Sequence, residues 1–171
     1  MKRILIAGIG NIFLGDDAFG VEIAQEMLKG QIAPGVHVVD FGIRSYDLAY
    51  ALVDGYEAAI LVDATARGEP PGTVYVIEVD LDQLSDIATA SVDAHSLNPL
   101  AALQMAAAMG DLPRKVYLVA CEPEDLGSES GRIGLSAAVR MAVPHAIDAI
   151  ENLVGDLLSV QTKTASGIAP V

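Results

Sequence analysis

The chain of 171 residues is 52% hydrophobic and carries a formal net charge of −13, from 23 acidic and 10 basic residues. This length predicts one domain with a substantial core. The excess of carboxylates argues against a nucleic-acid-binding protein, which needs clustered Lys and Arg to neutralise phosphates. No apolar run reaches the ~18 residues that span a bilayer, so we expect no membrane partner. A single cysteine excludes an internal disulfide and is typical of a reducing compartment, so we expect a cytoplasmic protein.

The N-terminal segment has the pattern of a strand, a glycine turn and a helix. Residues 4–7 form an unbroken apolar run, which is typical of a strand buried on both faces. A Gly-Ile-Gly turn follows at residues 8–10, and apolar residues recur at helical spacing over residues 20–28. Asp16 and Asp17 lie between the turn and the helix. We expect Asp16 to cap the helix, and one cap does not need two aspartates.

Such a segment also suggests a nucleotide-binding α/β domain, which we keep as an alternative. Asp40, at the end of a predicted second strand, fits the ribose contact of the dinucleotide fingerprint. The third glycine of that fingerprint is replaced by Phe13, however. Asp16 and Asp17 would also repel phosphate from the helix N-terminus, where a cation would be favoured.

The rest of the chain alternates between strand and helix patterns, which predicts a three-layer α/β/α fold with a mostly parallel, twisted five-stranded sheet. We expect further strands at residues 36–40, 58–64, 73–77 and 115–120, and helices at residues 46–53, 100–109 and 135–158. The connection over residues 65–72 is too short for a helical crossover, so strand 73–77 is predicted to be antiparallel and at an edge. Pro144 is expected to kink or divide the last helix. We expect one domain over residues 1–158 and a flexible C-terminal tail over residues 159–171.

Three polar residues could converge at one edge of this sheet. Asp17 follows the first strand, Asp63 ends the third, and His95 precedes the helix that leads into the fifth. Ligands of open parallel sheets gather outside the carboxyl ends of the strands. Two carboxylates and an imidazole could hold a divalent transition ion with open positions for substrate. Singly, each residue also has a structural explanation, as a helix cap or as a packed histidine.

A rival constellation pairs Cys121 with His95 as the nucleophile and base of a thiol hydrolase. Cys121 lies in sequence beside Glu122, Glu124 and Asp125, and these carboxylates would raise the pKa of the thiol. We therefore interpret Cys121 as a buried residue at the end of a strand.

The residues at this edge resemble those of the hydrogenase maturation proteases. The resemblance is carried by GIGNIFLGDDAFG at residues 8–20, by Asp63 in LVDA, by His95 in its Ser/Asn/Pro context, and by residues 122–124 and 134–136. It extends from Lys2 to about Val154. It implies a cytoplasmic endopeptidase that removes the C-terminal extension of a [NiFe]-hydrogenase large-subunit precursor after nickel insertion, with the nickel as recognition element.

The resemblance also implies roles for individual residues. The metal-contacting positions of the family map onto Asp17, Asp63 and His95, and the nickel is supplied by the substrate and bound transiently. The first position is Glu in some members, so Asp17 has a shorter reach. Either aspartate could act as the general base, which makes Asp17 and Asp63 the expected catalytic residues. Asp40 and Gly42 are expected to form the substrate-binding rim. We expect a monomer, and a nickel-binding chaperone without peptidase activity remains a second alternative.

Overall fold

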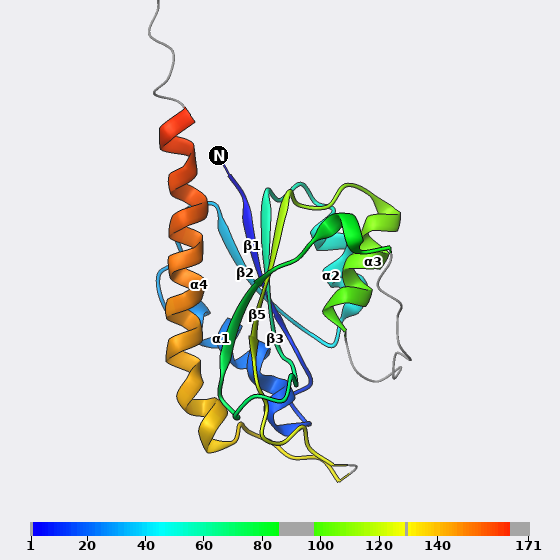
Figure 1. Ribbon diagram of the computed structural model, residues 1–171, viewed down its shortest axis with the longest axis vertical. Coiled ribbons are helices and arrows are strands. Elements are labelled where there is room, and N and C mark those ends of the chain that lie inside the picture. Colours follow the sequence, from blue (N-terminus) through cyan, green and yellow to red (C-terminus); the bar gives the residue numbers. More distant parts are fainter. Residues whose placement is uncertain (1, 86–97, 129, 165–171) are drawn as a thin grey trace, which may run out of the picture.

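The computed structural model describes residues 2–85, 98–128 and 130–164, and within them five strands form one twisted sheet (Figure 1). The strands are β1 (Ile4–Ile9), β2 (Val36–Gly42), β3 (Ala58–Ala64), β4 (Val74–Glu78) and β5 (Lys115–Cys121), in the spatial order β2-β1-β3-β5-β4. Neighbours pair in parallel, except that β4 runs antiparallel to β5 at the edge of the sheet. The predicted fold class and the antiparallel edge strand are thereby confirmed.

Helices cover both faces of the sheet and complete the three layers (Figure 1). Helices α1 (Phe19–Leu28) and α4 (Ala137–Thr164) pack on one face, and α2 (Ser45–Leu52) and α3 (Pro99–Met109) pack on the other. Two short 3₁₀ turns complete the described elements, η1 (Gly15–Ala18) and η2 (Leu81–Gln83). No helix in these ranges is long and apolar enough to cross a membrane.

The unbroken apolar runs in the central strands are explained by these two layers. In β1, Ile4 and Ile6 belong to the core under α1 and α4, whereas Leu5 and Ile9 belong to the core under α2 and α3. Because successive side chains of a strand point to opposite faces, a strand buried on both sides needs an apolar residue at every position. The two cores therefore hold β1 at the centre of the sheet, where it fixes the position of the turn that follows.

The glycines around that turn permit close backbone packing. A Cβ atom on Gly20 would lie 2.0 Å from the carbonyl oxygen of Val62 and 2.4 Å from that of Ile9. Gly10 has φ of +143°, and a Cβ atom there would lie 1.7 Å from the carbonyl oxygen of Asp17. These glycines thus bring η1 and the first turn of α1 against the ends of β1 and β3, rather than leaving room for a phosphate.

Helix α4 differs from its prediction in two respects. It continues through Pro144 without division, and it ends at Thr164, beyond the predicted end at residue 158. Pro144 removes one backbone hydrogen bond, but the helix is held on the sheet by a buried stripe that includes Val139 and Ile150. Residues 159–164, predicted to belong to a flexible tail, are helical because an established helix extends at little cost once it is nucleated. The remainder of the predicted tail lies outside the described residues.

Candidate active site

Two carboxylates approach one another at the carboxyl edge of the central strands. Asp17 lies in η1, directly after the turn that ends β1, and Asp63 is the penultimate residue of β3. Strands β1 and β3 are neighbours in parallel register, so residues that follow them emerge side by side. Asp63 is only 6% exposed, and Asp17 is half-buried. The structure therefore brings together two of the three residues predicted as metal ligands.

The protonation of this pair is perturbed. Burial, together with the negative charge of Asp17, raises the pKa of Asp63 well above its ordinary value of 3.8. Burial also raises the pKa of Asp17. Within the described residues, each carboxylate receives one backbone hydrogen bond, at 2.9 Å from the N–H of Ala64 to Asp63 and at 2.8 Å from the N–H of Asn11 to Asp17. These bonds favour the charged forms without overcoming burial, so a proton or a cation is needed to stabilise the pair.

The donor chemistry of the pair suits a divalent cation. Carboxylate oxygens bind such ions at about 2.0–2.2 Å, and two carboxylates leave coordination positions for further ligands. His95, the predicted third ligand, lies outside the described residues. Within the described ranges, no group of three or more His, Cys, Asp and Glu side chains is arranged to hold a metal ion. The two aspartates therefore form only part of the predicted ligand set.

Asp16 has a different role from the one predicted for it. Its side chain caps neither η1 nor α1. It is fully buried and accepts hydrogen bonds from the backbone N–H groups of Glu124 (2.8 Å), Asp125 (2.9 Å) and Ser136 (2.7 Å), and from the Ser136 hydroxyl (2.9 Å). Burial alone would raise the pKa of Asp16, but these donors outweigh it and lower the pKa. Asp16 thus fastens the loop between β5 and α4 to the turn that carries Asp17.

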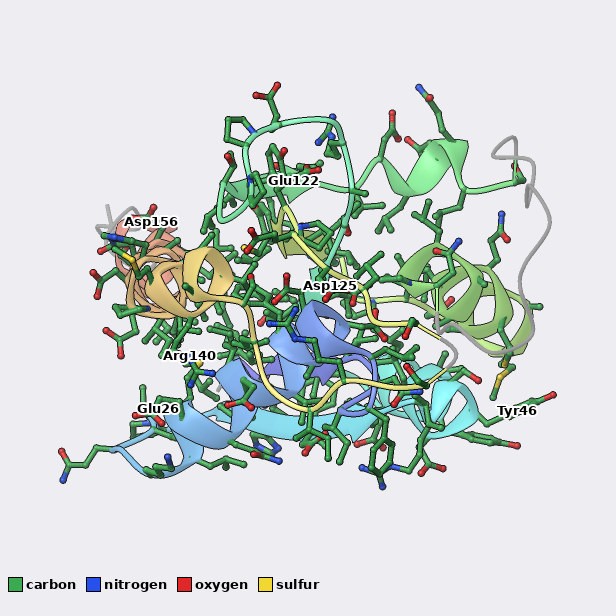
Figure 2. All side chains as sticks on the ribbon, turned by 90° about the horizontal axis from the view of Figure 1, so that it is seen from below. Glu26, Tyr46, Glu122, Asp125, Arg140 and Asp156 are labelled. Atoms are coloured by element: carbon green, nitrogen blue, oxygen red, sulfur yellow. The ribbon has the colours of Figure 1, made fainter. Side chains whose placement is uncertain are left out.

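The backbone strengthens this attachment. The N–H of Asp16 donates to the carbonyl of Asp125, and the N–H of Gly15 donates to the carbonyl of Arg132, each at 2.8 Å. Figure 2 views the molecule from this end and shows the loop around Asp125 lying close to η1. The turn that carries Asp17 is therefore held by hydrogen bonds that involve both its side chains and its backbone.

A groove of about 410 Å³ lies beside the glycine turn that precedes Asp17. Asp40 and Gly42, the predicted rim residues at the end of β2, both line it, together with the glycine turn and Arg44. Asp40 accepts a hydrogen bond from the side-chain amide of Gln25 at 3.1 Å. Asn11, whose backbone N–H donates to Asp17, also lines the groove, so the groove reaches a residue in direct contact with one of the two carboxylates.

Cys121 is unsuited to act as a nucleophile. It is the last residue of β5 and is fully buried. Burial, together with the charges of Asp16 and Glu122, raises the pKa of its thiol to about 11. The thiol is therefore protonated at neutral pH, which argues against the thiol-hydrolase alternative.

With this geometry established, a comparison of the sequence with known families identifies the class of protein. Residues 21–153 match the family model described as hydrogenase maturation protease. The chain belongs to this family. The matched range includes Asp63 and begins just after Asp17, and the family places the chain among the proteases.

Individual relatives agree with this assignment. The chain is 32% identical over 147 residues to the hydrogenase expression/formation protein HupD of Rhizobium leguminosarum bv. viciae, covering 85% of this chain and 71% of HupD. It is 27% identical over 149 residues to the hydrogenase 2 maturation protease of Escherichia coli K12, covering 86% and 88% of the two chains. The structure of the hydrogenase maturating endopeptidase HybD from E. coli superposes with a TM-score of 0.77 at 26% identity, covering 91% of this chain and 93% of HybD.

A third buried carboxylate in this maturation protease, Glu122, was not predicted to have a structural role. It lies directly after β5 and accepts hydrogen bonds from the N–H groups of Arg67 (2.8 Å) and Gly68 (3.2 Å) and from the hydroxyl of Tyr75 (2.8 Å). Burial alone would raise the pKa of Glu122, but these donors lower it. Glu122 therefore holds the β3–β4 connection, which starts directly after the strand that carries Asp63.

We expect Tyr75→Phe to lower the free energy of unfolding of this maturation protease by about 1 kcal/mol, because one hydrogen bond to a buried carboxylate is lost. Burial and the bond to Glu122 raise the pKa of Tyr75 to about 12, so the hydroxyl is a donor throughout the neutral range. Urea denaturation followed by circular dichroism measures the difference. Tyr46→Phe, on the exposed face of α2, is the matched control, and an equal effect of both substitutions would contradict the role of Glu122.

Proposed function

We propose that this protease works in the cytoplasm as a monomer and removes the C-terminal extension of a [NiFe]-hydrogenase large-subunit precursor after nickel insertion. The observation that carries the proposal is the pair of carboxylates, Asp17 and Asp63, whose pKa values are raised by burial and which a cation would stabilise. Membership of the hydrogenase maturation proteases supports the class of substrate.

In this proposal the nickel belongs to the substrate. Asp17 and Asp63, together with His95, complete the coordination of an ion that the precursor already holds, and so position the bond to be cut. Asp40 and Gly42 line the groove through which the extended segment of the precursor passes. The bound ion supplies a Lewis acid that polarises a carbonyl group or acidifies a water molecule.

The perturbed carboxyl of Asp63 suits proton transfer in such a reaction. Burial raises the pKa of Asp63 in the absence of a bound ion, and the precursor's cation would oppose that shift, so Asp63 is ionised and able to accept a proton when the ion is present. Asp63 takes a proton from the attacking water, and the protonated carboxyl then returns it to the leaving amine. Asp17 remains charged and holds the cation.

The test is to incubate the protein with nickel-loaded and nickel-free precursor and to measure the mass of each C-terminus. The proposal expects cleavage of the nickel-loaded precursor alone, and it expects that zinc added with nickel-free precursor does not substitute. Two carboxylates and an imidazole offer no thiolate, so their hold on a free ion is modest. Equal cleavage of both precursors would contradict recognition through the substrate's metal.

Cleavage of the precursor, binding of free nickel and thermal unfolding with added nucleotide together distinguish the alternatives. A chaperone would bind free nickel tightly and leave the loaded precursor uncut. A nucleotide-binding domain would be protected against thermal unfolding by a mononucleotide or dinucleotide.

A further inference from the structure

Exposed apolar side chains gather beside the carboxylate pair, on segments that are distant in sequence. The loop between β5 and α4 runs alongside the start of η1, where the N–H of Arg132 donates to the carbonyl of Phe13 at 2.8 Å. A Cβ atom on Gly127 would lie 2.9 Å from the Cα atom of Leu14, so the two backbones are in contact there as well. Four large apolar residues on these adjoining segments are exposed: Ile12 (47%), Phe13 (58%), Leu126 (45%) and Ile133 (82%). We call these four residues the apolar patch.

The segments that carry the apolar patch are held in place rather than loosely attached. Asp16 accepts three backbone hydrogen bonds and one hydroxyl bond from the loop, as described above. Within the loop, Asp125 forms an ion pair with Arg132 and accepts a hydrogen bond from the N–H of Gly127 at 2.8 Å. A surface that is ordered before a partner arrives loses little conformational entropy on binding. Exposed apolar residues held in this way are typical of a protein-docking site.

The position of the apolar patch indicates its occupant. Ile12 and Phe13 line the groove, and the preceding residue, Asn11, also lines it and donates its backbone N–H to Asp17. A protein whose extended segment lies in the groove would therefore have its folded part against the patch. The same edge carries the carboxylates of Asp17, Asp40 and the exposed Glu124 as well as the arginines Arg44 and Arg132, in a chain with a net charge of −13.

We propose that the apolar patch docks the folded body of the precursor whose C-terminal segment is cut, through an apolar surface of that precursor. This inference rests on the proposed function. It separates two parts of recognition: the groove and the carboxylates hold the extended segment, and the part of the patch that lies outside the groove lining, Leu126 and Ile133, holds the folded protein. Docking at the patch strengthens binding of the precursor before and during cleavage, so loss of the patch raises KM more than it lowers kcat.

The test compares single glutamine substitutions, which remove apolar surface without adding charge. Ile133→Gln and Leu126→Gln, both outside the groove lining, are each expected to raise the Kd of the nickel-loaded precursor about 10-fold or more, as for loss of one well-buried apolar side chain. Leu28→Gln is the matched control because Leu28 is similarly exposed, at 49%, but lies at the last turn of α1, away from η1. Kd is measured by titration calorimetry, and KM and kcat by the rate of cleavage.

The outcomes separate this inference from the proposed function. Weaker precursor binding by the two patch variants, with binding by the control unchanged, supports the docking surface. It does so even if the wild-type protein does not cleave the precursor, a result that would refute only the proposed function. Wild-type cleavage with unchanged Kd and KM in both patch variants would overturn the docking surface alone. Light scattering measures the oligomeric state of the patch variants. If that state changes while precursor binding does not, the patch contacts a second copy of the chain, and the inference is overturned.

Discussion

Asp63→Asn is expected to lower the rate of precursor cleavage by at least about 100-fold while the chain stays folded, because it removes both a ligand charge and a proton acceptor. The asparagine side chain has the same shape, and its oxygen can still accept the hydrogen bond from the N–H of Ala64. Cleavage is measured by mass spectrometry on nickel-loaded precursor, and folding by the thermal unfolding temperature.

Asp63→Asn is also expected to change the stability of the chain, in a direction that distinguishes a catalytic role of Asp63 from a role in the fold. The pKa of Asp63 is raised in the folded chain by burial and by the charge of Asp17, so the unfolded chain loses its proton first as the pH rises. The stability that this carboxyl contributes is therefore present in acid and is lost as the pH rises from 3.8 through the raised value. Asp63→Asn is uncharged at every pH, so near neutrality its unfolding temperature should equal or exceed that of the wild type.

Asp148→Asn, the same chemical change on the exposed face of α4, is the control and should leave cleavage unchanged. An active and stable Asp63→Asn variant would exclude Asp63 from the mechanism. Loss of cleavage together with a lower unfolding temperature would instead assign Asp63 to the fold.

Much of the fold was predictable because its signals are local. The apolar run at residues 58–64 has the bounds of β3, since a strand buried on both faces carries its pattern within its own residues. The short connection over residues 65–72 likewise contains the reason that β4 is antiparallel. The proximity of Asp17 and Asp63 followed from a general rule of parallel sheets, that polar residues after neighbouring strands meet at one edge.

The roles of Asp16 and Glu122 could not be predicted in this way. The donors to Asp16 lie 108 to 120 positions further along the chain, and no local pattern indicates that a loop returns to that carboxylate. A helix cap was the nearest local explanation, and it was wrong because long-range donors fill the acceptor sites of Asp16. The end of α4 was predicted at residue 158 rather than at Thr164 because the sequence signal is weak there. The apolar pattern that predicts a helix fades before the helix itself does.

Asp16→Asn is expected to lower the free energy of unfolding by about 3 kcal/mol, the largest stability effect that we predict for a single side chain. The amide keeps one acceptor oxygen, but its NH₂ group then faces N–H and O–H donors from Glu124, Asp125 and Ser136. The buried donors lose their charged partner, and the loop between β5 and α4 loses its attachment to η1. Chemical denaturation at neutral pH measures the difference.

Asp17→Asn, the identical change at the next residue, is the matched control, and its effect on stability should have the opposite sign or be absent. Burial raises the pKa of Asp17, so its charge is disfavoured in the folded chain, whereas the pKa of Asp16 is lowered by its donors. The stability contributed by Asp16 is therefore present near neutrality and is lost as the pH falls through its lowered pKa. The difference in the free energy of unfolding between wild type and Asp16→Asn should accordingly become smaller in acid. Equal stabilities of the two variants at neutral pH would show that the donors to Asp16 find other partners. If this difference in the free energy of unfolding does not become smaller in acid, the charge of Asp16 is not what holds the loop between β5 and α4 in place.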